Sequence, residues 1–237
     1  MVESIVNVFL SLPAFHVYRS IIVVTFIALA LWLTKALKMQ TKQYFKVVWL
    51  LPFIVEIIYQ AAAISYNDWK IDNSLPLEFS YITSIFASIY FFKAPNKVHG
   101  LVYFCGAWSA AAAFLNTNLI GNEPWYLFVR YYGHHGALLY YAAHSVLIGF
   151  RPVKKDFIHA ISFTSIVIIV GGIFNQIFNL NYMFTQSKPG GINLSSTMPP
   201  WPWYFVIILL MGLFFYTILF YLGRRKGQSS LVRHPQN

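Results

Sequence analysis

The chain has 237 residues, of which 58% are hydrophobic, 19% aromatic and only 10% charged, and its mean hydropathy is +0.57. Soluble domains carry about 25% charged residues, so this composition excludes a water-soluble enzyme, a DNA-binding domain and a disordered protein. The single cysteine, Cys105, excludes an intramolecular disulfide and a Cys-x-x-Cys metal site. The length fits one membrane domain over residues 1–237.

Seven apolar runs have the length that a helix needs to cross a bilayer, about 17–25 residues. Ser74-Leu75-Pro76 is expected to open the third run, with an N-cap and a proline in the first turn. Residues 1–15 are too short to span and are expected to lie along the outer interface. The sequence predicts an all-α, polytopic membrane protein, a bundle of about seven transmembrane helices at residues 20–36, 46–64, 75–92, 98–116, 126–149, 157–180 and 202–222.

The basic residues are distributed unevenly between the two sides of this bundle. Thirteen of the 17 lysines and arginines lie on one side, including those of the tail at residues 223–237. By the positive-inside rule this side is cytoplasmic, so the N-terminus is expected outside and the C-terminus inside. The net charge of +10 is therefore interpreted as a topology signal, and nucleic acid is not an expected partner.

Four spans place their most polar residues in the half of the bilayer that is expected to be outer. Ionisable groups at membrane depth are costly, so each is a candidate functional residue. We expect these side chains to form one polar pocket that opens outward. The candidates are Glu56 and Gln60 in the second span, Glu78 and Ser80 in the third, Arg130, His134 and His135 in the fifth, and Asn175, Asn179 and Asn181 towards the end of the sixth.

Several of these residues have a structural interpretation as well. Ser84 and Ser88 repeat at helical spacing after Ser80, which is typical of close helix packing. Ser80 differs because it lies near the start of its helix, where the macrodipole would stabilise an oxyanion. Asn175 and Asn179 are expected to share a helical face, where they either orient a histidine, donate to an oxyanion or link two helices.

The two adjacent histidines of the fifth span cannot both act on the same atom. His134 and His135 point about 100° apart on a helix, so that Arg130 shares a face with His134 and Tyr131 with His135. Glu56 is expected to pair with Arg130 or with a histidine. Ligand types for zinc are present, but no His-x-x-x-His or His-Glu-x-x-His spacing occurs, so no metal and no cofactor are expected.

Four short motifs, in chain order, carry a family resemblance: Leu75–Ser80 (LPLEFS), Tyr131–His135 (YYGHH), Asn179–Phe184 (NLNYMF) and Pro200–Tyr204 (PWPWY). Together with the span count, they resemble the YwaF-like bacterial integral membrane proteins. More distantly, the chain is similar to eukaryotic transmembrane lipid acyltransferases and androgen-induced-type lipid hydrolases. The resemblance implies a multi-pass protein of a bacterial plasma membrane.

These relatives also imply an intramembrane nucleophile on one helix and a histidine on another, which fall on Ser80 and His135. The family usually has Leu-Pro-Leu-His-Leu-Cys where this chain has Glu78 and Ser80. Serine attacks an ester when a histidine removes its proton, although it is a poorer nucleophile than cysteine. Glu78 is then either a carboxylate that orients His135 or a sign that catalysis is lost.

The first functional hypothesis is an enzyme, a lipid acyltransferase, transacylase or esterase that acts on acyl esters in the outer leaflet. Ser80 attacks the ester, His135 acts as base and then acid, and Glu78, Asn175 and Asn179 orient or stabilise. Membrane lipids or another acylated substrate are the expected partners. The acyl chains are expected beside the tyrosines of the fifth span, Tyr131, Tyr132, Tyr140 and Tyr141.

The second hypothesis is a carrier or receptor for a lipid or small solute. The same pocket would then bind the ligand through the charge partners Glu56, Glu78, Arg130 and His134, with Tyr131 and Asn181 also lining it. Intramembrane acidic, basic and histidine residues are typical of proton-coupled transport as well. A third hypothesis is a non-catalytic membrane partner. The sequence predicts no oligomeric state.

Overall fold

The computed structural model describes residues 2–190 and 193–224, and within these ranges every regular element is a helix. This confirms the all-α prediction. Short 3₁₀ helices flank several of the longer helices, and the π-helix Val102–Gly106 (η3) joins α5 to α6. The α-helices are α1 (Val2–Leu10), α2 (Ala14–Ala36), α3 (Leu51–Ser65), α4 (Phe79–Lys93), α5 (Pro95–Leu101), α6 (Ala107–Phe114), α7 (Trp125–Leu147), α8 (Lys154–Phe178) and α9 (Trp203–Gly223).

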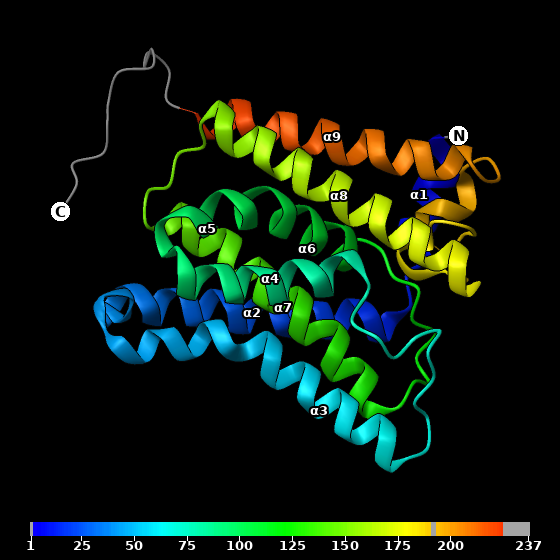
Figure 1. Cartoon of the computed structure of the whole chain (residues 1–237), viewed down its shortest axis with the longest axis horizontal. Coiled ribbons are helices and arrows are strands. Elements are labelled where there is room, and N and C mark those ends of the chain that lie inside the picture. Colours follow the sequence, from blue (N-terminus) through cyan, green and yellow to red (C-terminus); the bar gives the residue numbers. More distant parts are fainter. Residues whose placement is uncertain (1, 191–192, 225–237) are drawn as a thin grey trace.

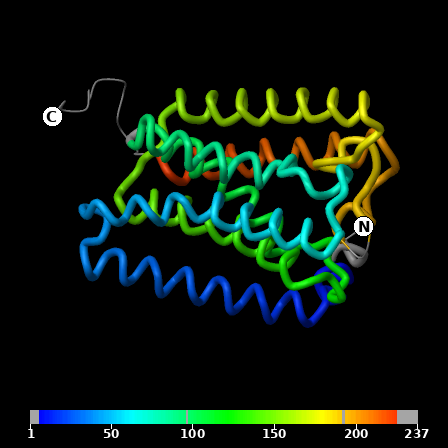
Figure 2. The backbone as a smooth tube through the Cα atoms, turned by 60° about the horizontal axis from the view of Figure 1, so that its bottom comes forward, coloured from blue at the N-terminus to red at the C-terminus, as the bar shows by residue number. Residues whose placement is uncertain are grey.

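Helix α7 lies at the centre of the bundle. It packs against α2, α3, α4 and α6, whereas α8 packs against α4, α5 and α9 (Figure 1). Figure 2 shows α8 and α2 on opposite sides of the molecule. The residues predicted to be functional on α7 therefore lie in the interior, between the two outer layers.

The tyrosines of α7 are part of this packed interior. The hydroxyl of Tyr140 lies 2.7 Å from that of Thr34, and the hydroxyl of Tyr141 donates to the carbonyl oxygen of Val48 at 3.0 Å. The ring of Tyr141 stacks on Trp49 with the centroids 4.0 Å apart. Buried tyrosines are stable when the ring is enclosed and the hydroxyl has a partner, as here.

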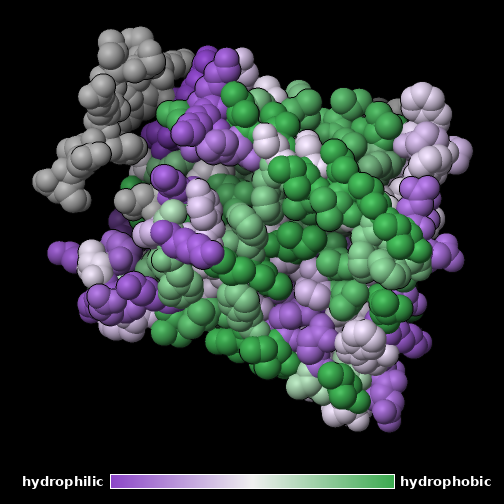
Figure 3. Space-filling view, viewed as in Figure 1, coloured by the Kyte–Doolittle hydropathy of each residue, from purple (hydrophilic) through white to green (hydrophobic). Residues whose placement is uncertain are grey.

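The outer helices carry the features of a membrane protein. Four helical segments are long and apolar enough to cross a membrane, namely α2, Gln43–Ser65 (which includes α3), α8 and α9. Figure 3 shows a broad hydrophobic surface across the middle of the molecule and hydrophilic residues gathered at its two ends. The segments predicted as the third, fourth and fifth spans are helical too, but the span count of seven and the orientation stay predictions.

The third predicted span begins later than expected. Helix α4 starts at Phe79, and Glu78 precedes it with extended backbone (φ −67°, ψ 144°), so the predicted opening at Ser74 and Pro76 is wrong. The hydroxyl of Ser74 does not cap this helix, because it accepts from the backbone N–H of Lys70 at 2.9 Å. Glu78 is thus placed by a loop rather than by a helical turn.

Other boundaries also differ. Helix α2 begins at Ala14, six residues before the predicted span, with Pro13 as its N-cap residue. Helix α8 ends at Phe178, and Asn179 follows in the left-handed conformation (φ 54°, ψ 48°) that commonly ends helices. The prediction that Asn175 and Asn179 share a helical face is therefore wrong. Of the predicted basic tail, residues 225–237 lie outside the described residues.

Candidate functional site

A buried ionic network joins α3 to α7. The carboxylate of Glu56 accepts from Nε and Nη2 of Arg130, each at 3.0 Å, and from Nε2 of His134 at 3.2 Å. Gln60, one turn further along α3, donates to the same carboxylate at 2.6 Å. The prediction that Glu56 pairs with Arg130 or a histidine is confirmed. Two-point contact of a guanidinium with a carboxylate is the strong form of such a pair.

Arg130 also holds the segment that leads into α4. Its Nη1 donates to the carbonyl oxygen of Asn73 and its Nη2 to that of Ser74, both at 2.9 Å. The guanidinium lies over the rings of Tyr59 and Tyr81, with the central carbon 3.9 and 4.5 Å from the two centroids. Only 1% of Arg130 is exposed, so its charge is stabilised by these partners rather than by water.

His134 extends the network to α4. Since Nε2 of His134 faces a carboxylate, it carries the proton, and Nδ1 accepts from the hydroxyl of Ser84 at 2.6 Å. A hydroxyl, an imidazole and a carboxylate are thus hydrogen-bonded in the order found in serine hydrolases. Ser84 and His134 are completely buried. We call Glu56, Gln60, Ser84, Arg130 and His134 the closed network.

The contact between Ser84 and His134 did not follow from the sequence, which favoured helix packing for Ser84. The serine spacing on α4 indicated a buried face, and that part holds, because Ser80, Ser84 and Ser88 are all buried. The pairing with a histidine 50 residues later depends on how α4 and α7 cross.

His135 lies in a different environment from His134. Its Nδ1 is 2.7 Å from the carbonyl oxygen of Tyr131. A carbonyl oxygen only accepts, so Nδ1 carries the hydrogen and Nε2 of the neutral ring keeps a free lone pair. Nε2 has no hydrogen-bond partner among the described residues, and 7% of His135 is exposed. A ring held in this way has the form of a general base.

Ser80 lies in the first turn of α4, and its hydroxyl also has no hydrogen-bond partner in the described part of the chain. It is 8% exposed. The next residue, Tyr81, has its ring centroid 6.1 Å from that of His135 and 4.6 Å from that of His134. Ser80 and His135 are thus on packed helices but are not hydrogen-bonded to each other. We call them the open pair.

A further buried histidine, to which the sequence did not point, lies near His135. His16 of α2 is fully buried, and its Nδ1 is 2.9 Å from the hydroxyl of Tyr132. Tyr131 stands between α2 and α6, because its hydroxyl donates to the carbonyl oxygen of Ala113 at 2.9 Å and its ring contacts that of His16. The predicted interfacial segment ends at residue 15 and the first predicted span begins at residue 20, so His16 belongs to neither. A histidine at the edge of an apolar run was the signal that could have identified it as a buried residue.

Three of the remaining candidates, Glu78, Asn175 and Asn181, hold the loop after α8. Glu78 accepts from the backbone N–H of Met183 at 2.9 Å, and Asn175 donates to the carbonyl oxygen of Tyr182 at 2.7 Å. Asn181 accepts from two backbone N–H groups of the following turn, and Asn179 is exposed. The structure brings none of these four side chains into hydrogen-bonding contact with His135. The single polar pocket that the sequence predicts is divided into separate groups.

Tyr182 fixes this loop to the segment before α4. Its hydroxyl donates to the carbonyl oxygen of Ile71 at 2.5 Å and accepts from the backbone N–H of Leu75 at 3.1 Å. Burial raises the pKa of Tyr182 to about 12, so the hydroxyl is protonated at neutral pH and remains a donor.

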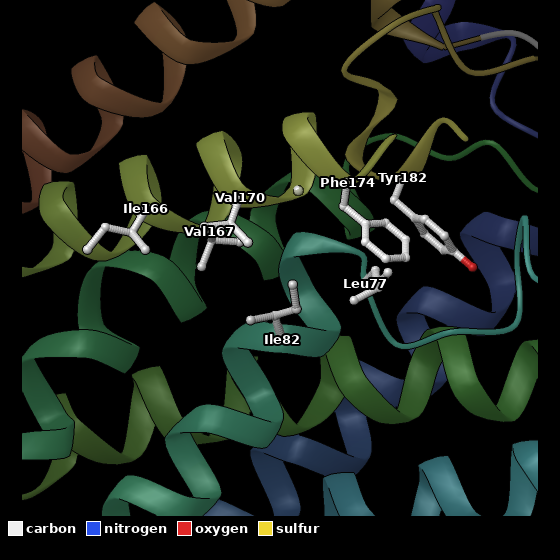
Figure 4. A pocket seen from close by; sticks show the side chains of 8 residues that line it. Leu77, Ile82, Ile166, Val167, Val170, Phe174 and Tyr182 are labelled. Atoms are coloured by element: carbon white, nitrogen blue, oxygen red, sulfur yellow. The ribbon is translucent and has the colours of Figure 1, made fainter. Parts of the chain in front are cut away.

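An apolar groove of about 240 Å³ lies between the start of α4 and α8 (Figure 4). The side chains of Leu77 and Ile82 line it from α4 and the segment before it, and Phe174 and Tyr182 lie at one end. This groove is not beside the tyrosines of α7, where the sequence placed the acyl chains. Ser80 is not among the side chains that line it, although Leu77 and Ile82, which precede and follow Ser80 in the sequence, are.

Metal ligands are not grouped in the part of the chain that the structure describes, where no three His, Cys, Asp or Glu side chains could hold one ion. The side chain of Cys105 is buried, and its Sγ lies 3.8 Å from the carbonyl oxygen of Ala160.

Comparison with known protein families gives a match that covers most of the chain. The model of the TMEM164 family matches residues 9–221, which include α2 to α8, the closed network and the open pair. The chain belongs to the TMEM164 family. A TMEM164-family assignment and the four long apolar helices agree on a membrane protein. Comparison with curated proteins and with solved structures finds no match.

Proposed function

We propose that this TMEM164-family membrane protein is an intramembrane lipid acyltransferase, transacylase or esterase, in which Ser80 is the nucleophile and His135 the base. One observation carries the proposal. The imidazole of His135 is fixed by the carbonyl oxygen of Tyr131 so that Nε2 keeps its lone pair, and the hydroxyl of Ser80 lies on the helix that packs against it. Neither Nε2 nor this hydroxyl has a hydrogen-bond partner in the described part of the chain.

The chemistry follows from these two groups. The oxygen of Ser80 bonds to the carbonyl carbon of the ester, and its proton passes to Nε2 of His135. When the tetrahedral intermediate collapses, the ester C–O bond breaks and His135 returns the proton to the leaving alcohol. An acceptor alcohol or a water molecule then releases the acyl group from Ser80. The start of α4 favours the oxyanion that forms near Ser80.

The other groups would support this reaction indirectly. The closed network fixes α3, α4 and α7 relative to one another, which places the first turn of α4. The groove between α4 and α8 offers an acyl chain an apolar surface beside the start of α4. Glu78 and Asn175, with Asn179 and Asn181, would act through the loop after α8.

A reaction is favoured over ligand transport because Glu56, Arg130 and His134 bind one another and not an open cavity. The seven-span bundle with an outer N-terminus, and a place in a bacterial plasma membrane, belong to the same proposal. The positive-inside charge distribution supports the orientation, and the YwaF-like motifs support the location.

A serine-directed fluorophosphonate probe on the purified protein tests the site. Labelling is expected to fall to background in Ser80→Ala and in His135→Ala, and to persist in Ser84→Ala. Ser80→Cys is expected to gain reactivity towards iodoacetamide, which buried Cys105 does not supply. Equal labelling of wild type, Ser80→Ala and His135→Ala would exclude the proposed reaction. Loss only in Ser84→Ala would transfer the nucleophile to the closed network.

A further inference from the structure

Arg19 lies at the end of the bundle where α2 and α7 begin, and no described side chain acts as its counter-ion. Its guanidinium lies 3.6 Å above the ring of Phe128 and 5.6 Å from that of Phe15. No carboxylate in the described ranges forms an ion pair with it, and it makes no side-chain hydrogen bond there. Contact with the rings stabilises the charge in part, but leaves its N–H donors unused.

The nitrogens of this guanidinium are not equivalent. Nη1 is enclosed and has no hydrogen-bond partner, whereas Nε and Nη2 are not enclosed. The accessible edge of Arg19 is therefore the one that carries two parallel N–H donors. This edge fits two oxygens of one carboxylate or phosphate.

The acidic residue closest in sequence to Phe128 is Glu123, and it forms no ion pair with Arg19. The carboxylate oxygens of Glu123 accept from the backbone N–H groups of Ile120 at 2.5 Å and Gly121 at 2.8 Å, which closes the loop before α7. Arg130 shows the contrast, because four hydrogen bonds and two aromatic rings satisfy it. An arginine at a membrane boundary that lacks hydrogen-bond and ion-pair partners is costly unless an anion from outside the chain binds it.

We propose that Arg19, held between Phe15 and Phe128, binds the phosphate group of a membrane phospholipid. The chain would supply a two-donor edge for the phosphate oxygens and an aromatic surface for the apolar part of the same molecule. A bilayer provides phosphate at the depth where its apolar helices end, so a lipid headgroup is the source favoured over free phosphate. Binding at this site requires no turnover, and it is independent of Ser80 and His135.

Titration of the purified protein in a non-ionic detergent tests this site. Three probes separate the sources: dihexanoylphosphatidylglycerol, dihexanoylglycerol without a phosphate, and inorganic phosphate. The phosphatidylglycerol is expected to bind wild type at least about tenfold more tightly than Arg19→Gln, with Arg19→Lys between them because a lysine keeps the charge but not the two-donor edge. Lys70→Gln, which removes an exposed lysine, is the matched control and is expected to bind like wild type.

Thermal unfolding of each variant without ligand reports whether the fold survives. If Arg19→Gln does not fold, the comparison of wild type with Arg19→Lys decides, with a loss of at least about threefold expected. Equal binding of the phosphatidylglycerol by wild type and the Arg19 variants would overturn the proposal, as would equal binding of dihexanoylglycerol. Inorganic phosphate binding as tightly as the lipid would replace the lipid headgroup with free phosphate.

Discussion

Two adjacent histidines of one helix lie in opposite chemical environments. Both ring nitrogens of His134 are hydrogen-bonded within the closed network, whereas His135 uses only Nδ1 and leaves Nε2 free. The difference arises because neighbouring residues of a helix point about 100° apart. His134 contacts α3 and α4, and His135 lies beside Tyr131, which contacts α2 and α6. Burial alone therefore does not tell a histidine with both ring nitrogens bonded from one whose second nitrogen has no partner among the described residues.

The largest effect on stability is expected when the carboxylate of the closed network is removed, because the two nitrogens of His134 would then no longer both be bonded. Glu56→Ala leaves Arg130, which is 1% exposed, without its ion pair. Loss of one partner of a buried ion pair typically costs about 3–5 kcal/mol, and a change of that size in the free energy of unfolding is expected. Denaturant unfolding in detergent measures it. Asp72→Ala, at an exposed position, is the control, and an equal effect of both variants would show that the closed network contributes little to stability.

The parts of the fold that the sequence predicted well depend on local chemistry. Long apolar runs must be helical in a membrane, and α2, α8 and α9 follow those runs. The pairing of Glu56 with Arg130 also follows from the cost of an isolated charge at that depth. Neither prediction required knowledge of how the helices cross.

The parts that could not be predicted depend on contacts between distant segments. Helix α4 starts at Phe79 and not near Pro76. Ser74 does not cap it, because its hydroxyl accepts from the backbone N–H of Lys70 and its carbonyl oxygen accepts from Arg130. His16 became part of the interior through a hydrogen bond to a tyrosine 116 residues away. Such choices among competing partners are made by tertiary structure, and a single sequence does not carry them.

A smaller effect is expected at the loop after α8, which lies outside both histidine environments. A Cβ at Gly171 would lie 1.9 Å from Cε of Met183, so Gly171→Ala must displace that side chain. Because this atom is the free end of a flexible side chain, Met183 can rotate away at a small cost, so Gly171→Ala is expected to lose most of the gain of about 0.5–1 kcal/mol that a helix normally draws from a Gly→Ala change. Gly172→Ala is a close control, since no atom lies within 4 Å of its Cβ position, and a gain of about 0.5–1 kcal/mol is expected from helix propensity. Unfolding of the two variants checks both values, and equal stability would contradict this packing.

If Gly171→Ala also lowers labelling of Ser80 by the serine-directed probe, the loop contributes to the open pair. Labelling that stays at the wild-type level would limit the loop to a structural role. The same measurement in Gly172→Ala shows whether a change in α8 alone has an effect.

The smallest effect is expected when the carboxyl group of Glu78 is replaced by an amide. Glu78 accepts one backbone N–H, that of Met183, and the amide oxygen of a glutamine accepts the same bond. Glu78→Gln should therefore change the free energy of unfolding by less than about 0.5 kcal/mol and the probe labelling by less than about twofold. Glu56→Gln is the matched variant, because there the lost charge faces Arg130. A strong loss of labelling in Glu78→Gln alone, with the fold intact, would instead make Glu78 the carboxylate that orients His135.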